Sequence, residues 1–395
     1  MAPANWEGAA AVVAPAGSLP APRLQRSSAS AELTVHLVGR LTAPVLGFLL
    51  PLLDTLHSAG RAQALVYVDG AGPALPPERL PAGLRLLPVA DHANPLGRIV
   101  ALYTALGRLT REQSIATLHL HGLLPGLAAM HWLYRRPRGQ VQVYFSPHSS
   151  RALLRQTLLR RSLARLLQLG LGRHEARTIV NMSPELQTLQ PLAALPASVL
   201  ESPVPAVFFD APRREARRPL LISCNLEGQR AAVDAFARIA VLLNDDALSL
   251  NFNWVGQAEP EAAAALKAAG VGQFAVASDE SRAQRLGTAW IYVAPTEERG
   301  FPVRLAEAMA AGLPSVALDT PNHRCLLDEG VTGYLCTDLD GLLQRIAELV
   351  DSRALRESMG AAAREVARAR FSEPVFKARL LDMVAAAEAD GRPAP

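Results

Sequence analysis

Several residue patterns that mark common protein classes are missing from this sequence. Its 395 residues include only three cysteines, Cys224, Cys325 and Cys336, which have no metal-ligand spacing and do not form an even set. This pattern argues against a disulfide-stapled secreted domain and favours a reducing, cytoplasmic compartment. The longest apolar run, residues 43–53, is interrupted by two prolines and is too short to cross a bilayer. We therefore expect this run to form a buried helix.

Catalytic and nucleic-acid signatures are also scarce. The sequence contains no Ser/His/Asp relay, no Walker loop, no Cys/His zinc spacing and no RNA-recognition or helix-turn-helix signature, so nucleic acid is not an expected partner. Half of the residues are hydrophobic and 19% are charged, with a formal net charge of +4, so two domain cores can be buried. Residues 1–30 are rich in Ala, Pro and Ser, which predicts a disordered tail rather than a signal peptide.

The rest of the sequence alternates regularly between strand-like and helix-like segments. Helical patterns at residues 95–109, 124–133 and 149–169 separate β-rich runs of the first half. Those runs are residues 33–38, 64–68, 84–89, 117–121, 141–145 and 178–182. Such alternation predicts the α/β class with a parallel, doubly wound sheet, in which ligands bind at the carboxyl ends of the strands.

A Pro-rich segment, residues 204–219, is interpreted as an interdomain linker. Beyond it the same alternation begins again, with strands expected at residues 220–223, 248–254, 273–276, 290–293 and 315–318. The sequence therefore predicts one domain at residues 31–203 and a second at residues 220–373. A closing helix and tail are expected at residues 374–395.

The most informative stretch is residues 291–318, which reads as strand, polar loop, helix and strand. The helix opens near Pro302 and stops at Gly312, a typical breaker. Gly300 lets a ligand approach the backbone, and the N–H groups at the helix start suit an anion such as a diphosphate. Glu307 lies one turn further in, where its carboxylate can accept hydrogen bonds from sugar hydroxyls. An ordinary crossover between two strands explains the fragment equally well.

At these residues the chain resembles the retaining GT-B glycosyltransferases, specifically glycosyltransferase family 4 (group 1). The matching blocks are Gly300-Phe301-Pro302, Glu307-Ala308-Met309-Ala310 and Gly312-Leu313-Pro314-Ser315-Val316-Ala317. The resemblance implies a GT-B fold, in which two Rossmann-like domains face a cleft. It also implies transfer of a sugar from a nucleoside diphosphate sugar to a hydroxyl, with no metal and no cofactor.

The resemblance assigns roles to residues of the second domain. In the family, a first Glu contacts the donor sugar and a second holds the nucleotide ribose, and Glu307 matches the second. The first Glu aligns with Arg299, so Glu298 is the carboxylate nearest that position and is a catalytic candidate. The family also places an Arg and a Lys in the loop after the first strand of this domain. Asn225 stands where that Arg is expected, and Arg230 is the cation left to neutralise the leaving diphosphate.

These assignments give a candidate site with three parts. The catalytic candidates are His148, Arg230 and Glu298. The donor-binding candidates are Asn225, Arg299, Gly300, Phe301, Pro302 and Glu307. The acceptor-side candidates are Gly39, Arg40, His121, Gly122 and Ser149. A plain strand-to-helix turn also explains Gly39 and Arg40, and a structural role is common for a single histidine at the end of a strand.

His119 and His121 form a His-x-His pair whose imidazoles point to one face of a strand, so that a metal site is conceivable. Two ligands without a third histidine or carboxylate nearby in the sequence are weak evidence for a metal. A structural or substrate-contacting role is favoured for both, and no metal is expected.

Residues 151–177 carry seven arginines against a single acid, with leucines along one face of the predicted helix. A basic amphipathic helix of this kind can rest on anionic lipid or meet a lipid-linked acceptor. A solvated helix packed on the sheet through its leucines is the alternative.

The sequence therefore predicts a cytoplasmic glycosyltransferase for bacterial polysaccharide or glycolipid synthesis, and peripheral contact with the inner membrane stays open as one of the two interpretations of residues 151–177. Two other functions remain open. The departures at Asn225 and Arg299 fit a catalytically inactive GT-B protein that acts as a binding or partner subunit. A sugar-phosphate epimerase or phosphorylase would need a carboxylate-rich cleft or a cofactor lysine, and the sequence offers neither.

Overall fold

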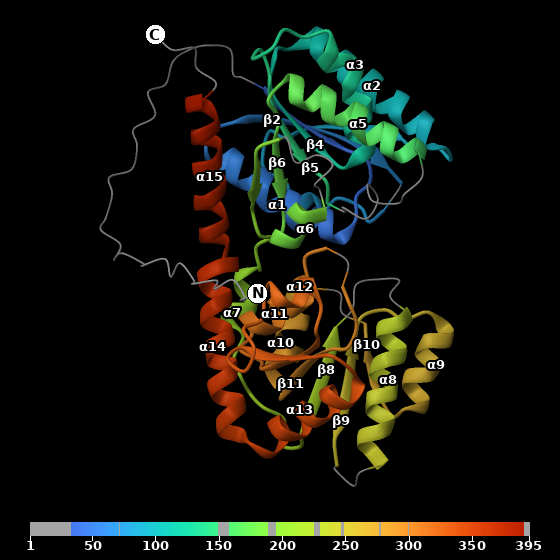
Figure 1. Ribbon diagram of the computed structural model, residues 1–395, viewed down its shortest axis with the longest axis vertical. Helices are drawn as coiled ribbons and strands as arrows, with labels where there is room; N and C mark the ends of the chain where they lie inside the picture. Colours follow the sequence, from blue (N-terminus) through green and yellow to red (C-terminus); the bar gives the residue numbers. More distant parts are fainter. Residues whose placement is uncertain are drawn as a thin grey trace, which may run out of the picture. The chain divides into compact units, whose positions relative to one another are not determined.

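The computed structural model describes residues 33–70, 72–148, 158–188, 195–224, 230–245, 249–275, 278–298 and 300–390. The expected tail at residues 1–30 lies outside these ranges. So do three site candidates, Asn225, Ser149 and Arg299. The described residues form two parallel sheets with helices packed against them, as the alternating sequence pattern predicts (Figure 1).

The first sheet has seven strands in the order β3-β2-β1-β4-β5-β6-β7, and all of its pairs are parallel. Its strands are β1 Leu33–Val38, β2 Ala62–Asp69, β3 Arg85–Ala90, β4 Ile115–His121, β5 Gln142–Ser146, β6 Arg177–Val180 and β7 Ala197–Val199. The helices between them are α1 Ala43–Ser58, α2 Pro95–Glu112, α3 Leu123–Tyr134, α5 Leu158–Arg173 and α6 Ser183–Thr188, with a 3₁₀ turn at Pro77–Arg79. The order reverses between β1 and β4, the kind of switch point at which such sheets bind ligands.

The second sheet has six strands in the order β10-β9-β8-β11-β12-β13, again all parallel. Its strands are β8 Leu220–Cys224, β9 Asn251–Val255, β10 Gly272–Phe274, β11 Ile291–Ala294, β12 Ser315–Leu318 and β13 Gly333–Cys336. The helices are α7 Ala206–Asp210, α8 Arg230–Asp245, α9 Pro260–Ala268, α10 Asp279–Thr288, α11 Val303–Ala310, α12 Pro321–Arg324, α13 Leu339–Asp351 and α14 Arg353–Phe371. Here the order reverses between β8 and β11.

The apolar run at residues 43–53 forms the start of α1, as expected. Thr42 caps this helix, since its side chain accepts a hydrogen bond from the Val45 N–H at 3.4 Å. Phe48 and Leu52 of α1 are buried with Phe376 and Leu380 of the last helix, α15 Glu373–Asp390. Helix α15 therefore packs against α1 of the first sheet (Figure 1).

Candidate active site

The loop between β11 and α11 carries most of the described donor-side candidates. Gly300 has a φ of 75°, a left-handed conformation in which a side chain would be strained. The side-chain N–H of Asn322 donates to the carbonyl oxygens of Glu298 at 2.7 Å and of Gly300 at 3.2 Å, and so fixes the loop. Pro302 is the residue just before α11, and Phe301 is buried with its ring 5.5 Å from that of Phe371. Phe301 is therefore an anchor for the loop.

Glu307 is held between two arginines. Its carboxylate accepts from Nε and Nη2 of Arg282 at 2.7 and 2.9 Å, and from Nη1 of Arg304 at 2.7 and 2.9 Å. The Glu307 side chain is only 3% exposed, so a buried carboxylate is balanced by two guanidinium groups. A ribose hydroxyl would have to displace one of these donors. Sequence reasoning missed both arginines, although the i,i+3 spacing of Arg304 and Glu307 on one helix was a readable signal.

Glu298 is the second buried carboxylate of this group. Burial raises its pKa to about 7, with Glu307 adding to the rise and Arg304 opposing it. At neutral pH this carboxyl group is therefore close to half protonated, the range in which a side chain can both accept and donate a proton. The structure thus brings Glu298, Glu307 and Arg304 together near the carboxyl end of the second sheet.

Arg230, the expected diphosphate cation, is engaged elsewhere. It begins α8, and its guanidinium donates to Asp234 of the same helix and to Glu261 of α9 at 2.9 to 3.2 Å. The side chain is 47% exposed, so these ion pairs are weak and can exchange with a ligand. Among the described residues, Arg304 rather than Arg230 lies beside the two carboxylates.

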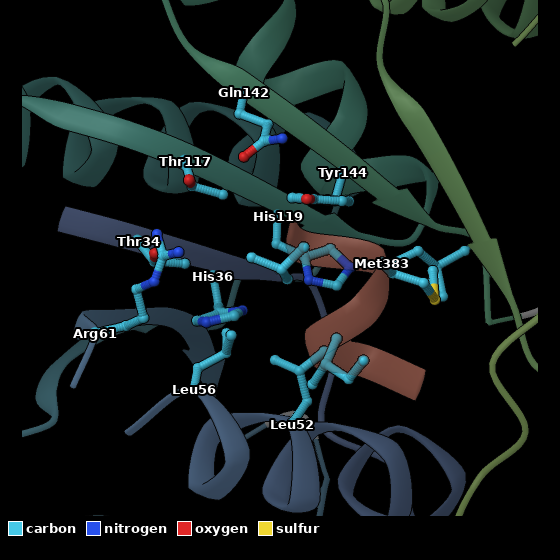
Figure 2. A pocket seen from close by; sticks show the side chains of 13 residues that line it. Thr34, His36, Leu52, Leu56, Arg61, Thr117, His119, Gln142, Tyr144 and Met383 are labelled. Carbon is cyan, nitrogen blue, oxygen red and sulfur yellow. The ribbon is translucent and has the colours of Figure 1, made fainter. Parts of the chain in front are cut away.

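On the first sheet, a small cavity of about 20 Å³ lies between β1, β4, β5, α1 and α15. His36, His119 and Tyr144 project into it from the strands, and Met383 reaches it from α15 (Figure 2). The Tyr144 hydroxyl is buried and has no hydrogen-bond partner in the part of the chain that the structure describes. A space of this size holds about one water molecule.

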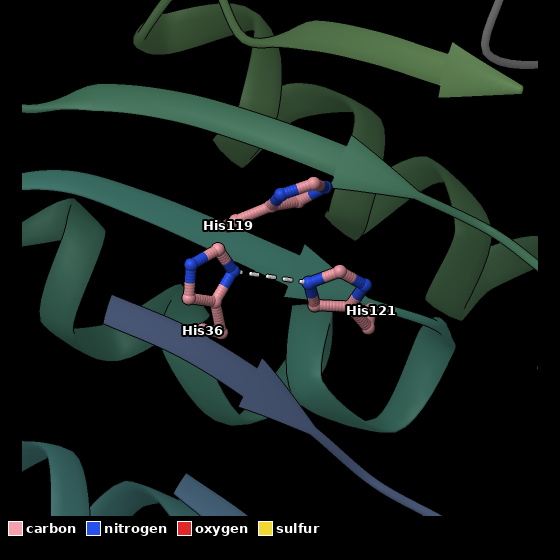
Figure 3. Close-up of side chains that lie close together, drawn as sticks. All are labelled: His36, His119 and His121. Atoms are coloured by element: carbon pink, nitrogen blue, oxygen red, sulfur yellow. Dashed lines mark hydrogen bonds between the residues drawn. The ribbon is translucent and has the colours of Figure 1, made fainter. Parts of the chain in front are cut away.

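Beside this cavity, four imidazoles from β1, β4 and the residues just after β5 are packed together. His119 and His121 of β4 stack with their ring centroids 4.0 Å apart, and His36 of β1 lies 5.6 Å from each (Figure 3). His148 stacks on His121 at 5.2 Å, and their Nε2 and Nδ1 atoms are 2.9 Å apart. Burial lowers the pKa of His36 and of His148 to about 4, and it lowers those of His119 and His121 well below the usual value. All four rings are therefore neutral at pH 7.

The remaining acceptor-side candidates surround this cluster. The N–H of Gly122 donates to the Ser146 carbonyl at 2.8 Å, and its φ of 99° requires glycine. His148 itself has a φ of 52°, an uncommon conformation that histidine tolerates better than most residues. A Cβ on Gly39 would lie 3.0 Å from the Pro125 ring, so close packing against α3 favours glycine there. Arg40 follows it and is exposed.

Comparison with known proteins concerns the fold and the family. Residues 219–352 match the family model "Glycosyl transferases group 1". No curated protein matches the sequence significantly.

Solved structures resemble the chain over most of its length. Sucrose-phosphate synthase from Thermosynechococcus elongatus has a TM-score of 0.73 at 14% identity, with 91% of this chain and 100% of that chain covered. A glycosyltransferase from Rickettsia africae has a TM-score of 0.73 at 12% identity, with coverages of 91% and 99%. Anabaena HepE, solved with UDP and glucose, has a TM-score of 0.68 at 13% identity, with coverages of 90% and 100%. The chain thus has the GT-B fold, and its residues 219–352 match the group 1 glycosyltransferase family.

Proposed function

We propose that this glycosyltransferase moves a sugar from a nucleoside diphosphate sugar to a hydroxyl of a glycan or lipid-linked acceptor, with retention of the anomeric configuration. The observation that carries the proposal is the buried group of Glu298, Arg304, Glu307 and Arg282 behind the Gly300 loop. It lies within the matched family segment, at the carboxyl edge of a parallel sheet, where ligands bind.

In this proposal the donor diphosphate meets the N-terminus of α11, whose dipole favours an anion, while the Val303 N–H already donates to the Phe301 carbonyl at 2.8 Å. Gly300 leaves the backbone open to the phosphates. Glu298 accepts hydrogen bonds from the donor sugar, and Glu307 accepts them from the ribose by giving up one of its arginine contacts. Arg304, freed in this way, and Arg230 are the cations proposed to balance the charge of the leaving diphosphate. A metal has no assigned part in the transfer step.

On the acceptor side, His148 is the proposed catalytic residue. Its neutral imidazole can contact the acceptor hydroxyl or the transferred sugar without bringing a competing positive charge. The backbone at the end of β5, two residues before His148, is held in place because the Gly122 N–H donates a hydrogen bond to the Ser146 carbonyl. Gly39, Arg40, His121 and Ser149 remain proposed acceptor-side contacts.

A cytoplasmic location at the inner-membrane surface is part of the proposal. None of the described helices combines the length and the hydrophobicity that a membrane span needs. On α5, Leu166 is 58% and Leu169 is 73% exposed, while Leu167 and Leu171 are buried. Exposed leucines next to arginines fit a helix that rests in a lipid interface. With a lipid-linked acceptor at this surface, we propose that the protein acts in bacterial polysaccharide or glycolipid synthesis.

The second candidate, a GT-B subunit that binds without catalysing, is favoured by the saturated ion pairs of the donor side. The buried Glu307 carboxylate is balanced by two guanidinium groups, and Arg230 is paired at the surface with Asp234 and Glu261. A site that never opens these pairs would not bind a donor productively.

Calorimetric titration with UDP, GDP and ADP tests the proposal. We expect one nucleotide to bind, and Glu307→Gln to weaken it by about 10-fold or more, since hydrogen bonds to a charged group contribute roughly 1.5–3 kcal/mol. Gln keeps the shape of the side chain, and Glu357→Gln on the surface of α14 is the matched control. If none of the three nucleotides binds, the donor-site assignment is wrong. Binding without turnover of the matching sugar nucleotides would favour the subunit.

A further inference from the structure

The third histidine that the sequence pattern lacked is supplied by a neighbouring strand. His36 of β1 is paired in register with His119 of β4, and His121 follows two residues later. Residues paired in register, and residues two apart on a strand, point to the same face of a sheet. The three imidazoles therefore lie on one face of the sheet (Figure 3), with exposures of 0%, 3% and 4%.

The ring nitrogens of these histidines are spaced as ligands of one ion. One nitrogen from each ring lies within 4.8 Å of the other two. His36 Nδ1 and His121 Nε2 are 3.4 Å apart, which is long for a hydrogen bond. It is close to the edge of about 3.3 Å that two nitrogens make in a tetrahedral site with metal–nitrogen distances of about 2.0–2.1 Å.

The orientation of His36 follows from its neighbour Gln63. The Gln63 amide donates from Nε2 to the Leu53 carbonyl at 2.9 Å, so its Oε1 is the atom that faces His36 Nε2 at 3.2 Å. Oε1 can only accept, so the proton of the neutral His36 ring is on Nε2. Nδ1 then carries a lone pair directed at His121, as a metal ligand would.

The other two histidines have outer partners of the same kind. His121 Nδ1 lies 2.9 Å from His148 Nε2, and His119 Nε2 lies 2.8 Å from the Ser146 hydroxyl. Metal-bound histidines almost always donate their second N–H to an acceptor, most often a carboxylate, a backbone carbonyl or water, and a hydroxyl oxygen or an imidazole nitrogen can accept in the same way. Each of the three imidazoles thus has one nitrogen held by an outer partner, and its other nitrogen is the one that would bind the ion.

The cavity beside His36 and His119 leaves room for a fourth ligand. Its volume of about 20 Å³ admits one water molecule, and the Tyr144 hydroxyl, which has no partner among the described residues, lines it (Figure 2). A metal-bound water there would receive a hydrogen bond from Tyr144 or donate one to it.

We propose that His36, His119 and His121 bind one divalent ion of the zinc class, with a water in the fourth position. Three imidazoles suit zinc, and they also bind cobalt, nickel or copper. The ion would join β1 to β4 where the sheet order reverses. With His121 Nδ1–H as donor, His148 Nε2 becomes an acceptor, so the ion also sets the orientation of His148. The site is separate from the donor side and does not depend on the proposed transfer reaction.

Metal binding to the purified, tag-free full chain tests this directly. The protein is stripped with EDTA in guanidinium, refolded without metal, and titrated with Zn²⁺ or Co²⁺; because the histidines are buried, a second sample is refolded with the ion present. We expect one equivalent bound, an absorption spectrum typical of tetrahedral Co²⁺, and a higher melting temperature with Zn²⁺. Failure of the wild-type chain to retain one equivalent by either route would overturn the proposal.

Variants then locate the site. His36→Gln should abolish stoichiometric binding, and Ser146→Ala should weaken it about 10- to 100-fold by removing only the outer partner of His119. His57→Gln, an exposed histidine at the end of α1, is the matched control and should bind as wild type does. Undiminished Co²⁺ spectra in a folded His36→Gln protein would place the ion elsewhere. If His36→Gln does not fold, Ser146→Ala becomes the test of the site. An unchanged affinity of Ser146→Ala for Zn²⁺ or Co²⁺ would then contradict the assigned ligands.

Discussion

The raised pKa of Glu298, a residue of the candidate site, makes the stability of this protein depend on pH. An isolated carboxyl group titrates near 4.5, and burial moves Glu298 to about 7, against the attraction of Arg304. Between these two values the folded state binds more protons than the unfolded state, so the free energy of unfolding falls as pH rises from about 4.5 to 7. Above pH 7 the charged Glu298 lowers the free energy of unfolding by a constant amount of about 3 kcal/mol, relative to its value near pH 4.5.

Glu298→Gln should therefore stabilise the protein above pH 7 and have little effect near pH 4.5. We expect its free energy of unfolding at pH 8 to exceed that of the wild type by up to about 3 kcal/mol, because the amide carries no charge to desolvate. Urea unfolding at several pH values measures the difference. Glu280→Gln, an exposed position on α10, should follow the wild-type curve. A Glu298→Gln protein that is equally stable, or less stable, at pH 8 would contradict the raised pKa.

Single residues were also where sequence reasoning was least complete. It proposed Glu307 from a motif, but the Arg282 that holds it lies on a different helix, 25 positions earlier. It found the His119 and His121 pair, but His36 lies 83 residues before His119 and is brought there only by the register of β1 and β4. Partners this far apart in the sequence leave no local residue pattern from which they could be predicted. The roles proposed for Asn225, Arg299 and Ser149 stay predictions, since these residues lie outside the described ranges.

At the scale of elements, the sequence predicted most of the architecture, because buried parallel strands are short apolar runs between recognisable helices. The start and end of β1 and β12 agree with the expected ranges, whereas β9 begins at Asn251 rather than at residue 248. Strands β7 and β13 were not expected. With three and four residues, they are too short to show a period, and β7 is mostly exposed.

Helix α15 offers a test of how a late segment contributes to the first sheet. Phe376 is 2% exposed, and its ring meets that of Phe48 of α1 edge-on at 5.9 Å. Phe376→Ala should lower the free energy of unfolding by about 3–5 kcal/mol, from lost burial and the cavity left behind. Leu381→Ala removes a side chain of the same helix that is 41% exposed, and should cost no more than about 0.5 kcal/mol. Urea unfolding measures both variants. An equal loss of unfolding free energy in the two would mean that the contact between Phe376 and Phe48 does not stabilise the packing of α15.

At the scale of the whole molecule, basic and apolar residues are unevenly distributed over the surface. We relate this distribution to binding of the acceptor rather than of the donor. Leu166 and Leu169 of α5 lie on the surface, as does the adjacent Arg165, and Tyr134 of the neighbouring α3 is 71% exposed. The Arg173 guanidinium lies 5.2 Å from the Tyr134 ring centroid. An exposed tyrosine, two leucines and arginines together form the kind of surface that binds at the boundary of anionic lipid.

Vesicle co-sedimentation tests whether this surface binds membrane. We expect the protein to sediment with phosphatidylcholine vesicles that contain phosphatidylglycerol, and to do so less as salt is added, because each basic residue near an anionic surface contributes about 1 kcal/mol that salt screens. Leu166→Gln with Leu169→Gln should weaken binding several-fold by removing the apolar part of the contact. Leu96→Gln with Val100→Gln, two exposed apolar residues of α2, is the matched control. Equal loss in both double variants would mean nonspecific adsorption, and no sedimentation of the wild type would leave the arginines of α5 as a solvated face.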